Sequence, residues 1–97
     1  MIKQHTLIAA LLLAPAPALA SSEDAWKEFR AKVLKSCEKA VAGKLEKAQI
    51  AVDPFGSDSY GVAIAQGLST DAKAPRRIIC IFDKRSEKVE VSGEFAP

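Results

Sequence analysis

Histidine and methionine are almost missing from the 97-residue sequence, which has one of each, His5 and Met1. Both lie in the first twenty residues, which have the features of an export signal. Once that signal is removed, the chain contains no imidazole group. This excludes Ser-His-Asp and Cys-His nucleophile systems, together with the common metal and haem sites that use histidine ligands.

Sequence motifs that cradle phosphate groups are missing as well, since neither G-x-x-x-x-G-K-[ST] nor G-x-G-x-x-G occurs. No single sign of charge dominates, because 14 Lys and Arg residues face 12 Asp and Glu residues. This balance argues against a nucleic-acid-binding module. The apolar run at residues 7–14 is far shorter than the roughly 20 residues that span a bilayer. We therefore expect no cofactor, no nucleic-acid partner and no transmembrane segment in the mature chain.

The first twenty residues are predicted to be a Sec signal peptide. Lys3 supplies a basic start, the apolar run follows, and Ala18, Leu19 and Ala20 form an A-x-A cleavage motif. Cleavage is expected before Ser21, so that residues 1–20 are removed and residues 21–97 form one small domain. The predicted location is the periplasm of a bacterium.

The two cysteines, Cys37 and Cys80, are predicted to form a disulfide, because such bonds persist in compartments that receive exported proteins. Counting both cysteines, the bond closes a loop of 44 residues. The chain-entropy relation gives about 4 kcal/mol of stabilisation for a loop of that length. The C-x-x-C spacing of redox motifs is absent, and two thiols are too few to complete a zinc site.

An amphipathic helix is predicted directly after the signal peptide. Residues 21–24 combine two serines with two acidic residues, a pattern typical of a helix start. Apolar side chains then recur three or four residues apart, at Trp26, Phe29, Val33, Cys37 and Val41. Gly43 is a typical residue after a helix end, although Leu45 and Ala48 continue the spacing by one more turn. Cys37 lies within the apolar stripe and is expected to face the core.

After the helix the apolar period changes from about 3.6 residues to two, which indicates strands. Four strands are expected, at residues 49–53, 60–67, 76–83 and 88–92. Short turn-forming segments separate them, whereas a parallel crossover needs a dozen residues or more. The predicted fold class is therefore α+β, with one N-terminal helix packed on a four-stranded antiparallel meander and a disulfide between helix and sheet.

The disulfide also predicts which side chains of the sheet face the helix. Cys80 must point toward Cys37, so its neighbours Ile79 and Ile81 must point away. In the remaining strands the large side chains are assigned to the core. The helix side is thus expected to hold Ile50, Val52, Tyr60, Val62, Ile64, Ile78, Phe82, Val89 and Val91.

The opposite face of the sheet is the candidate interface. Its expected members are Gly61, Ala63, Ala65, Ile79 and Ile81. A solvated sheet face ordinarily carries polar residues, as Lys88 and Glu90 illustrate in the last strand. Small and apolar residues in central strands indicate either a face that a partner covers or an apolar strip tolerated in a monomer.

Two further groups of residues are candidates for function. The first group consists of basic residues that flank the third strand, namely Arg76, Arg77, Lys84 and Arg85. They form either a basic edge that binds an anionic surface or ordinary solvated strand ends. Asp53 and Asp58 flank the first turn of the sheet. They are an acid–base pair, cation-binding oxygens or turn-forming residues, and the last interpretation is preferred because a turn in so small a domain rarely builds a buried cleft.

Taken together, these patterns predict a small exported, non-catalytic module that binds a protein, as a binding module or an inhibitor, through one sheet face. Its partner would be an envelope protein or a second copy of the chain. The alternative is an accessory or structural subunit of the envelope that binds anionic lipid or a membrane complex through the basic edge, which leaves contact with a membrane surface open. A hydrolase that relies on carboxylates ranks third.

Overall fold

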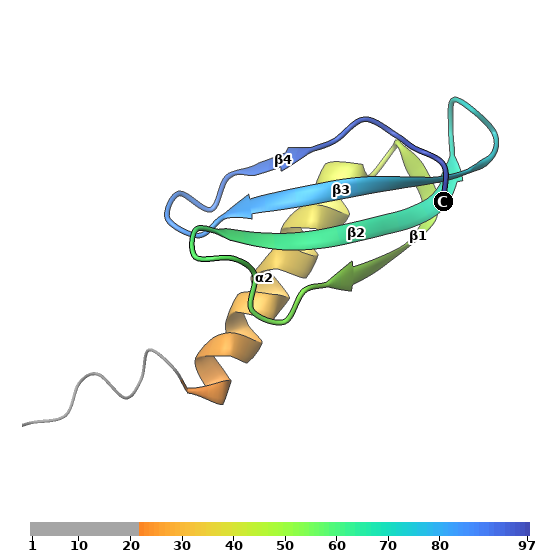
Figure 1. Ribbon diagram of the computed structural model, residues 1–97. Helices are drawn as coiled ribbons and strands as arrows, with labels where there is room; N and C mark the ends of the chain where they lie inside the picture. Colours follow the sequence, from red (N-terminus) through yellow and green to blue (C-terminus); the bar gives the residue numbers. More distant parts are fainter. Residues whose placement is uncertain (1–21) are drawn as a thin grey trace, which may run out of the picture.

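The computed structural model describes residues 22–97, so the predicted signal peptide, with Ala18, Ala20 and Ser21 at its cleavage point, lies outside the described residues. The elements follow in the order α2 (Glu23–Val41), β1 (Leu45–Val52), β2 (Tyr60–Ser69), β3 (Pro75–Asp83) and β4 (Val89–Val91). The strands form one antiparallel sheet in the order β1-β2-β3-β4. Helix α2 crosses one face of this sheet (Figure 1). The predicted α+β meander is therefore confirmed.

Helix α2 begins and ends where the capping residues predict. The side-chain oxygen of Ser22 accepts a hydrogen bond from the Ala25 N–H at 3.1 Å, and acidic residues occupy the first turn. Ala42 leaves the helical conformation, and Gly43 follows with a φ of +85°, which glycine adopts at little cost. The helix does not continue through Leu45. Among residues 22–97, the structure contains no helix that could span a membrane.

Strand β1 is longer than the sequence predicts, because a bulge interrupts its alternation. It begins at Leu45, only two residues after Gly43, whereas the sequence indicates a start at residue 49. The register with β2 shifts between Glu46 and Gln49, and Lys47 has a φ of +53°. Such a bulge adds a residue to one strand and hides the two-residue period. The remaining strand boundaries agree with the prediction to within two residues.

The core lies between α2 and the sheet and is divided into two adjoining clusters. One cluster surrounds the disulfide and consists of Val33, Cys37, Ala63, Cys80 and Phe82. The other consists of Val41, Leu45, Ala65 and Ile78. The predicted disulfide joins Cys37 of α2 to Cys80 of β3, with 6.0 Å between their Cα atoms. The bond therefore fixes the middle of the helix to a strand in the interior of the sheet.

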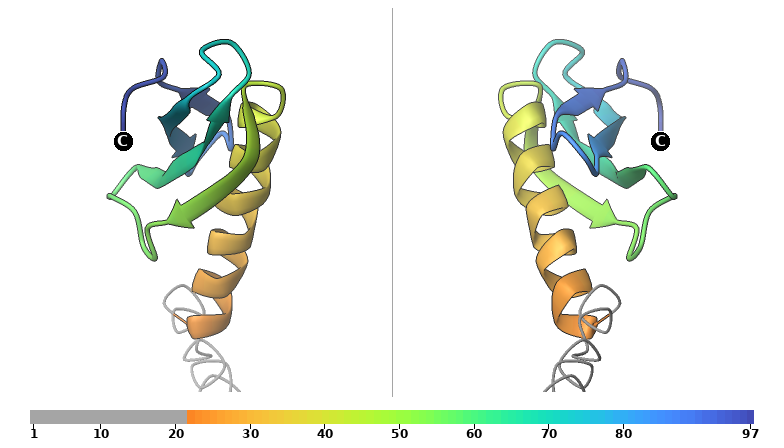
Figure 2. Two further views of the ribbon diagram at one scale, coloured as in Figure 1. Left: turned by 90° about the vertical axis from the view of Figure 1, so that its right-hand side faces the viewer. Right: turned by 90° about the vertical axis from the view of Figure 1, so that its left-hand side faces the viewer.

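The domain has two layers, and one outer surface is a sheet face. In the side views of Figure 2, α2 lies against one face of the sheet, and no helix or strand of residues 22–97 lies on the other. The partly buried side chains of β1 and β4 pack against the core on the helix side, as the alternation predicts; they are Ile50, Val52, Val89 and Val91. We call the opposite surface, formed by the sides of β1–β4 that α2 does not cover, the open face.

Candidate protein-binding face

Strand β2 turns its small residues toward the helix, which is the reverse of the sequence prediction. Ala63 and Ala65 are 1% and 0% exposed, and Gly61 is buried as well. Ala63 lies opposite Cys80 and Ala65 lies opposite Ile78, so both share the helix side with the disulfide. The prediction that Gly61, Ala63 and Ala65 lie on the open face is therefore wrong, as is the prediction that Tyr60, Val62 and Ile64 face the helix.

The physical reason for this reversal is the close approach of α2 to β2. A Cβ atom at Gly61 would lie 2.7 Å from Cγ2 of Val33, which is too close, and 3.0 Å from Cζ of Phe29, which is tighter than an ordinary contact. The helix therefore needs small residues beneath it along β2, while Ile78 and Phe82 of β3 fill the volume beside it. Assigning the faces of β2 by side-chain size alone gives the opposite result.

The open face is consequently more apolar than predicted. Register places Val62 opposite Ile81 and Ile64 opposite Ile79, so the two strands expose neighbouring branched side chains. Four large apolar residues keep about two-fifths of their surface in water: Tyr60 at 45%, Ile64 at 42%, Leu68 at 43% and Ile81 at 40%. Ile79 and Ile81 lie on this face, as their alternation with Cys80 requires. The sequence analysis did not assign the larger β2 residues to this face, namely Tyr60, Val62, Ile64 and Leu68. The G-x-A-x-A spacing of β2 was the signal that a helix lies close to the side that carries the small residues.

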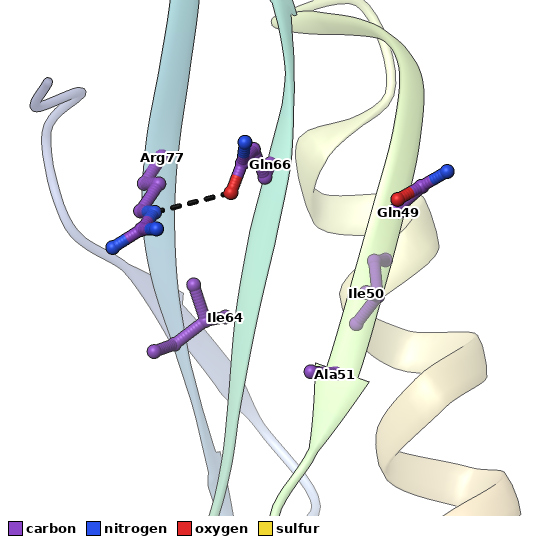
Figure 3. A pocket seen from close by; sticks show the side chains of 6 residues that line it. All are labelled: Gln49, Ile50, Ala51, Ile64, Gln66 and Arg77. Carbon is purple, nitrogen blue, oxygen red and sulfur yellow. Dashed lines mark hydrogen bonds between the residues drawn. The ribbon is translucent and has the colours of Figure 1, made fainter. Parts of the chain in front are cut away.

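An open hollow lies beside Ile64 on this face, with a volume of about 460 Å³. The residues that line it come from β1, β2 and β3 and are Gln49, Ile50, Ala51, Ile64, Gln66 and Arg77 (Figure 3). Because Ala51 is small and Ile64 is large, the surface steps down from β2 to β1. The Nε atom of Arg77 donates a hydrogen bond to Oε1 of Gln66 at 3.1 Å, which orients the guanidinium group.

Charged residues border the two ends of the open face. Arg77 lies at the end near the β2–β3 loop, and Glu90 of β4 lies opposite Ile81 toward the other end. Near Glu90, a smaller hollow of about 150 Å³ is lined in part by Asp83 and Lys88. The N–H groups of Ser86 and Arg85 donate to the Asp83 carboxylate at 3.0 and 2.8 Å, and they lower the pKa of this carboxyl below its ordinary value. Asp83 therefore stabilises the β3–β4 turn as an anion.

The four basic residues of the predicted edge do not form one surface. Strand β3 pairs with β2 on one side and with β4 on the other, so it is not an edge strand. Arg76 and Arg77 are consecutive in a strand and point to opposite faces. Lys84, at the far end of β3, donates to the carbonyl oxygens of Phe55 and Ser57 at 2.9 and 2.6 Å. The prediction of a single basic edge is corrected accordingly.

Lys84 instead belongs to an aromatic cluster at the N-terminal end of α2. Its Nζ atom lies 5.4 Å from the ring centroid of Trp26 and 5.0 Å from that of Phe29. Trp26 makes edge-on contacts with Phe29 and Phe55, with centroid distances of 5.7 and 4.9 Å. Lys84 thus holds the β1–β2 loop against the helix and is engaged within the fold.

The two aspartates of the first turn also have separate surroundings. Oδ2 of Asp53 accepts a hydrogen bond from the Gly56 N–H at 2.6 Å, which is the turn-forming role preferred from the sequence. Asp58 is exposed in the same loop. Within residues 22–97, no three His, Cys, Asp or Glu side chains are grouped so that they could hold a metal ion.

The open face is therefore the surface whose composition departs most clearly from that of a solvated sheet. Comparisons of the chain with protein-family models, with curated proteins and with solved structures found no match.

Proposed function

We propose that the protein is a small exported, non-catalytic module that binds a protein surface through its open face. The observation that carries this proposal is the exposure of Tyr60, Ile64, Leu68 and Ile81 on one side of the sheet. Exposed apolar side chains that gather on one surface are characteristic of interaction sites. The disulfide between Cys37 and Cys80 supports export to an oxidising compartment, and the proposed location is the periplasm.

The free energy available from these residues indicates what kind of partner is needed. Full burial of a large apolar side chain is worth about 1.5–3 kcal/mol, so covering the exposed two-fifths of each residue recovers roughly 1 kcal/mol. Four such residues give about 4 kcal/mol, which is comparable with the smallest free-energy cost of association. A partner must therefore cover the whole open face and satisfy the polar groups at its border.

A lipid surface is a weaker candidate, because its recognition was predicted to depend on the basic edge. Arg76 and Arg77 point to opposite faces of the sheet, and Lys84 is held by two carbonyl groups and two aromatic rings. These residues do not present a common plane of positive charge to a membrane. A protein surface that fits the apolar open face agrees better with the structure.

The proposal is tested by placing a photo-crosslinking amino acid at position 64 in the organism that makes the protein. The matched control has the same amino acid at Leu34, which is similarly exposed at 37% but lies on α2. We expect irradiation to form a discrete protein–protein adduct from position 64 and none from position 34. Equal yields at the two positions, or no adduct from position 64, would contradict binding through the open face.

A further inference from the structure

On the basis of the proposed function, we infer that the protein surface covering the open face is a second copy of this chain, packed face to face with its strands antiparallel to those of the first. The inference rests on the even spacing of the large apolar side chains of β2 about the centre of the face, on the charges at its border and on its area.

The Ile64–Ile79 pair lies at the centre of the open face. On β2, Tyr60 is four residues from Ile64 in one direction, and Leu68 is four residues away in the other. A two-fold axis that crosses the strands at this pair places each strand over its own copy in the reverse direction. Ile64 then meets Ile64 of the second copy, and Tyr60 meets Leu68. These contacts along β2 join apolar side chains that are exposed in the single chain. On β3 the same rotation places Ile81 over Arg77 of the second copy, whose aliphatic stem covers it.

The same axis brings opposite charges together at the border. Arg77 and Ile81 lie two residues to either side of Ile79, and Glu90 lies opposite Ile81. The rotation therefore places Glu90 of the second copy on the facing sheet, opposite Phe95, which pairs with Arg77, and so one strand spacing to the side of Arg77. Within residues 22–97, no hydrogen bond or ion pair engages the terminal nitrogens of Arg77 or the carboxylate of Glu90. Each dimer would gain this pair twice, because a two-fold interface repeats every contact.

The area of the face suits a partner of the same shape. Strands β2 and β3 have 10 and 9 residues, which at about 3.3 Å per residue extend for about 30 Å, and four strands about 4.8 Å apart span about 15–20 Å. The face then measures roughly 450–600 Å² per chain, or 900–1,200 Å² in a dimer, at the lower limit for a specific interface. A second sheet covers this area, whereas one extended peptide covers only a fraction.

The test is sedimentation equilibrium of the protein, isolated with its disulfide intact, between about 1 µM and 1 mM. The wild type is expected to be in reversible equilibrium between monomer and dimer. Ile64→Lys sets two like charges against each other at the axis and is expected to weaken the dimer at least a hundredfold. Leu34→Lys introduces the same charge on α2 and is expected to leave the dimer unchanged. Circular dichroism of each variant establishes that it is folded.

Charge reversal tests the orientation of the two copies. Arg77→Glu and Glu90→Arg are each expected to weaken the dimer by about tenfold, because each turns two attractive pairs into repulsive ones. The variant that carries both changes restores opposite charges and is expected to return to within about threefold of the wild type. If the double variant is weaker than both single variants, the antiparallel arrangement is wrong.

The outcomes separate this inference from the proposed function. A protein that stays monomeric up to 1 mM, or a dimer that Ile64→Lys leaves intact, overturns the second copy as the occupant of the open face. The proposed function survives that result if position 64 still crosslinks to a protein of another mass. It fails together with the inference if position 64 gives no adduct.

Discussion

At the scale of single residues, Gly61 shows most directly which side of β2 faces the helix. Gly61→Ala places a methyl group 2.7 Å from Cγ2 of Val33, a stiff side chain that cannot turn away. We expect a loss of about 1–3 kcal/mol in the free energy of unfolding, as for other overpacked cores. The gain of about 0.4–1 kcal/mol from restricting the unfolded chain does not offset this loss. The measurement is urea unfolding of both proteins.

Gly93→Ala is the matched control for this substitution, because a Cβ atom at Gly93 meets nothing within 4 Å. We expect it to leave the stability unchanged or to raise it by up to about 1 kcal/mol. If Gly61→Ala behaves like this control, α2 does not approach β2 as closely as described.

The sequence predicts individual side-chain orientations only where a covalent or pairing constraint exists. The orientation of Ile79 and Ile81 follows from the position of Cys80 between them, and both residues lie on the open face. No comparable constraint acts on β2, where Tyr60, Val62 and Ile64 alternate with Gly61 and Ala63. Two opposite arrangements bury an alternating set of apolar residues. The register of β2 with β3 and the close approach of α2 decide between them.

At the scale of secondary-structure elements, the disulfide is the connection between α2 and the sheet whose removal has the most predictable effect. We expect Cys37→Ala combined with Cys80→Ala to lower the free energy of unfolding by about 4 kcal/mol, within the usual range of about 2–5 kcal/mol. Both cysteines are fully buried, so the variant also loses packing in the core. Chemical denaturation of the oxidised wild type and the double variant measures the difference. A loss below about 1 kcal/mol would contradict the prediction.

The element pattern was largely predictable, because local signals agree with the fold. Ser22 caps α2, Gly43 follows its end, and short turns dictate antiparallel neighbours. The first part of β1 was not predictable from its period. Lys47 and the neighbouring bulge shift the alternation by a residue, so that the segment from Leu45 to Ala48 resembles a continuation of the helix. A bulge depends on pairing with β2, which a local pattern does not contain.

At the scale of the whole molecule, the two-layer architecture itself creates the open face. Helix α2 covers one side of a four-stranded sheet, and residues 22–97 supply no layer on the other side. The sequence pattern predicted that the open face would be apolar, but the β2 residues assigned to it were the wrong ones. The existence of an uncovered face follows from the number and order of elements. Its composition follows from β2 register, and its role as an interface remains a proposal.

A dimer formed through the open face would couple association to the stability of the whole domain. Because the second copy binds the folded chain and not the unfolded one, the midpoint of thermal unfolding must rise with protein concentration. At protein concentrations above the dissociation constant, each tenfold increase in concentration adds about 0.7 kcal/mol per chain to the free energy of unfolding. This is half of the usual 1.4 kcal/mol, because two chains share one dimer. For a domain of this size, that raises the melting temperature by about 3–6 °C. Scanning calorimetry at a series of concentrations measures this shift, and we expect Ile64→Lys to abolish it while Leu34→Lys retains it. A melting temperature that does not depend on concentration in the wild type would show that covering the open face contributes nothing to folding stability.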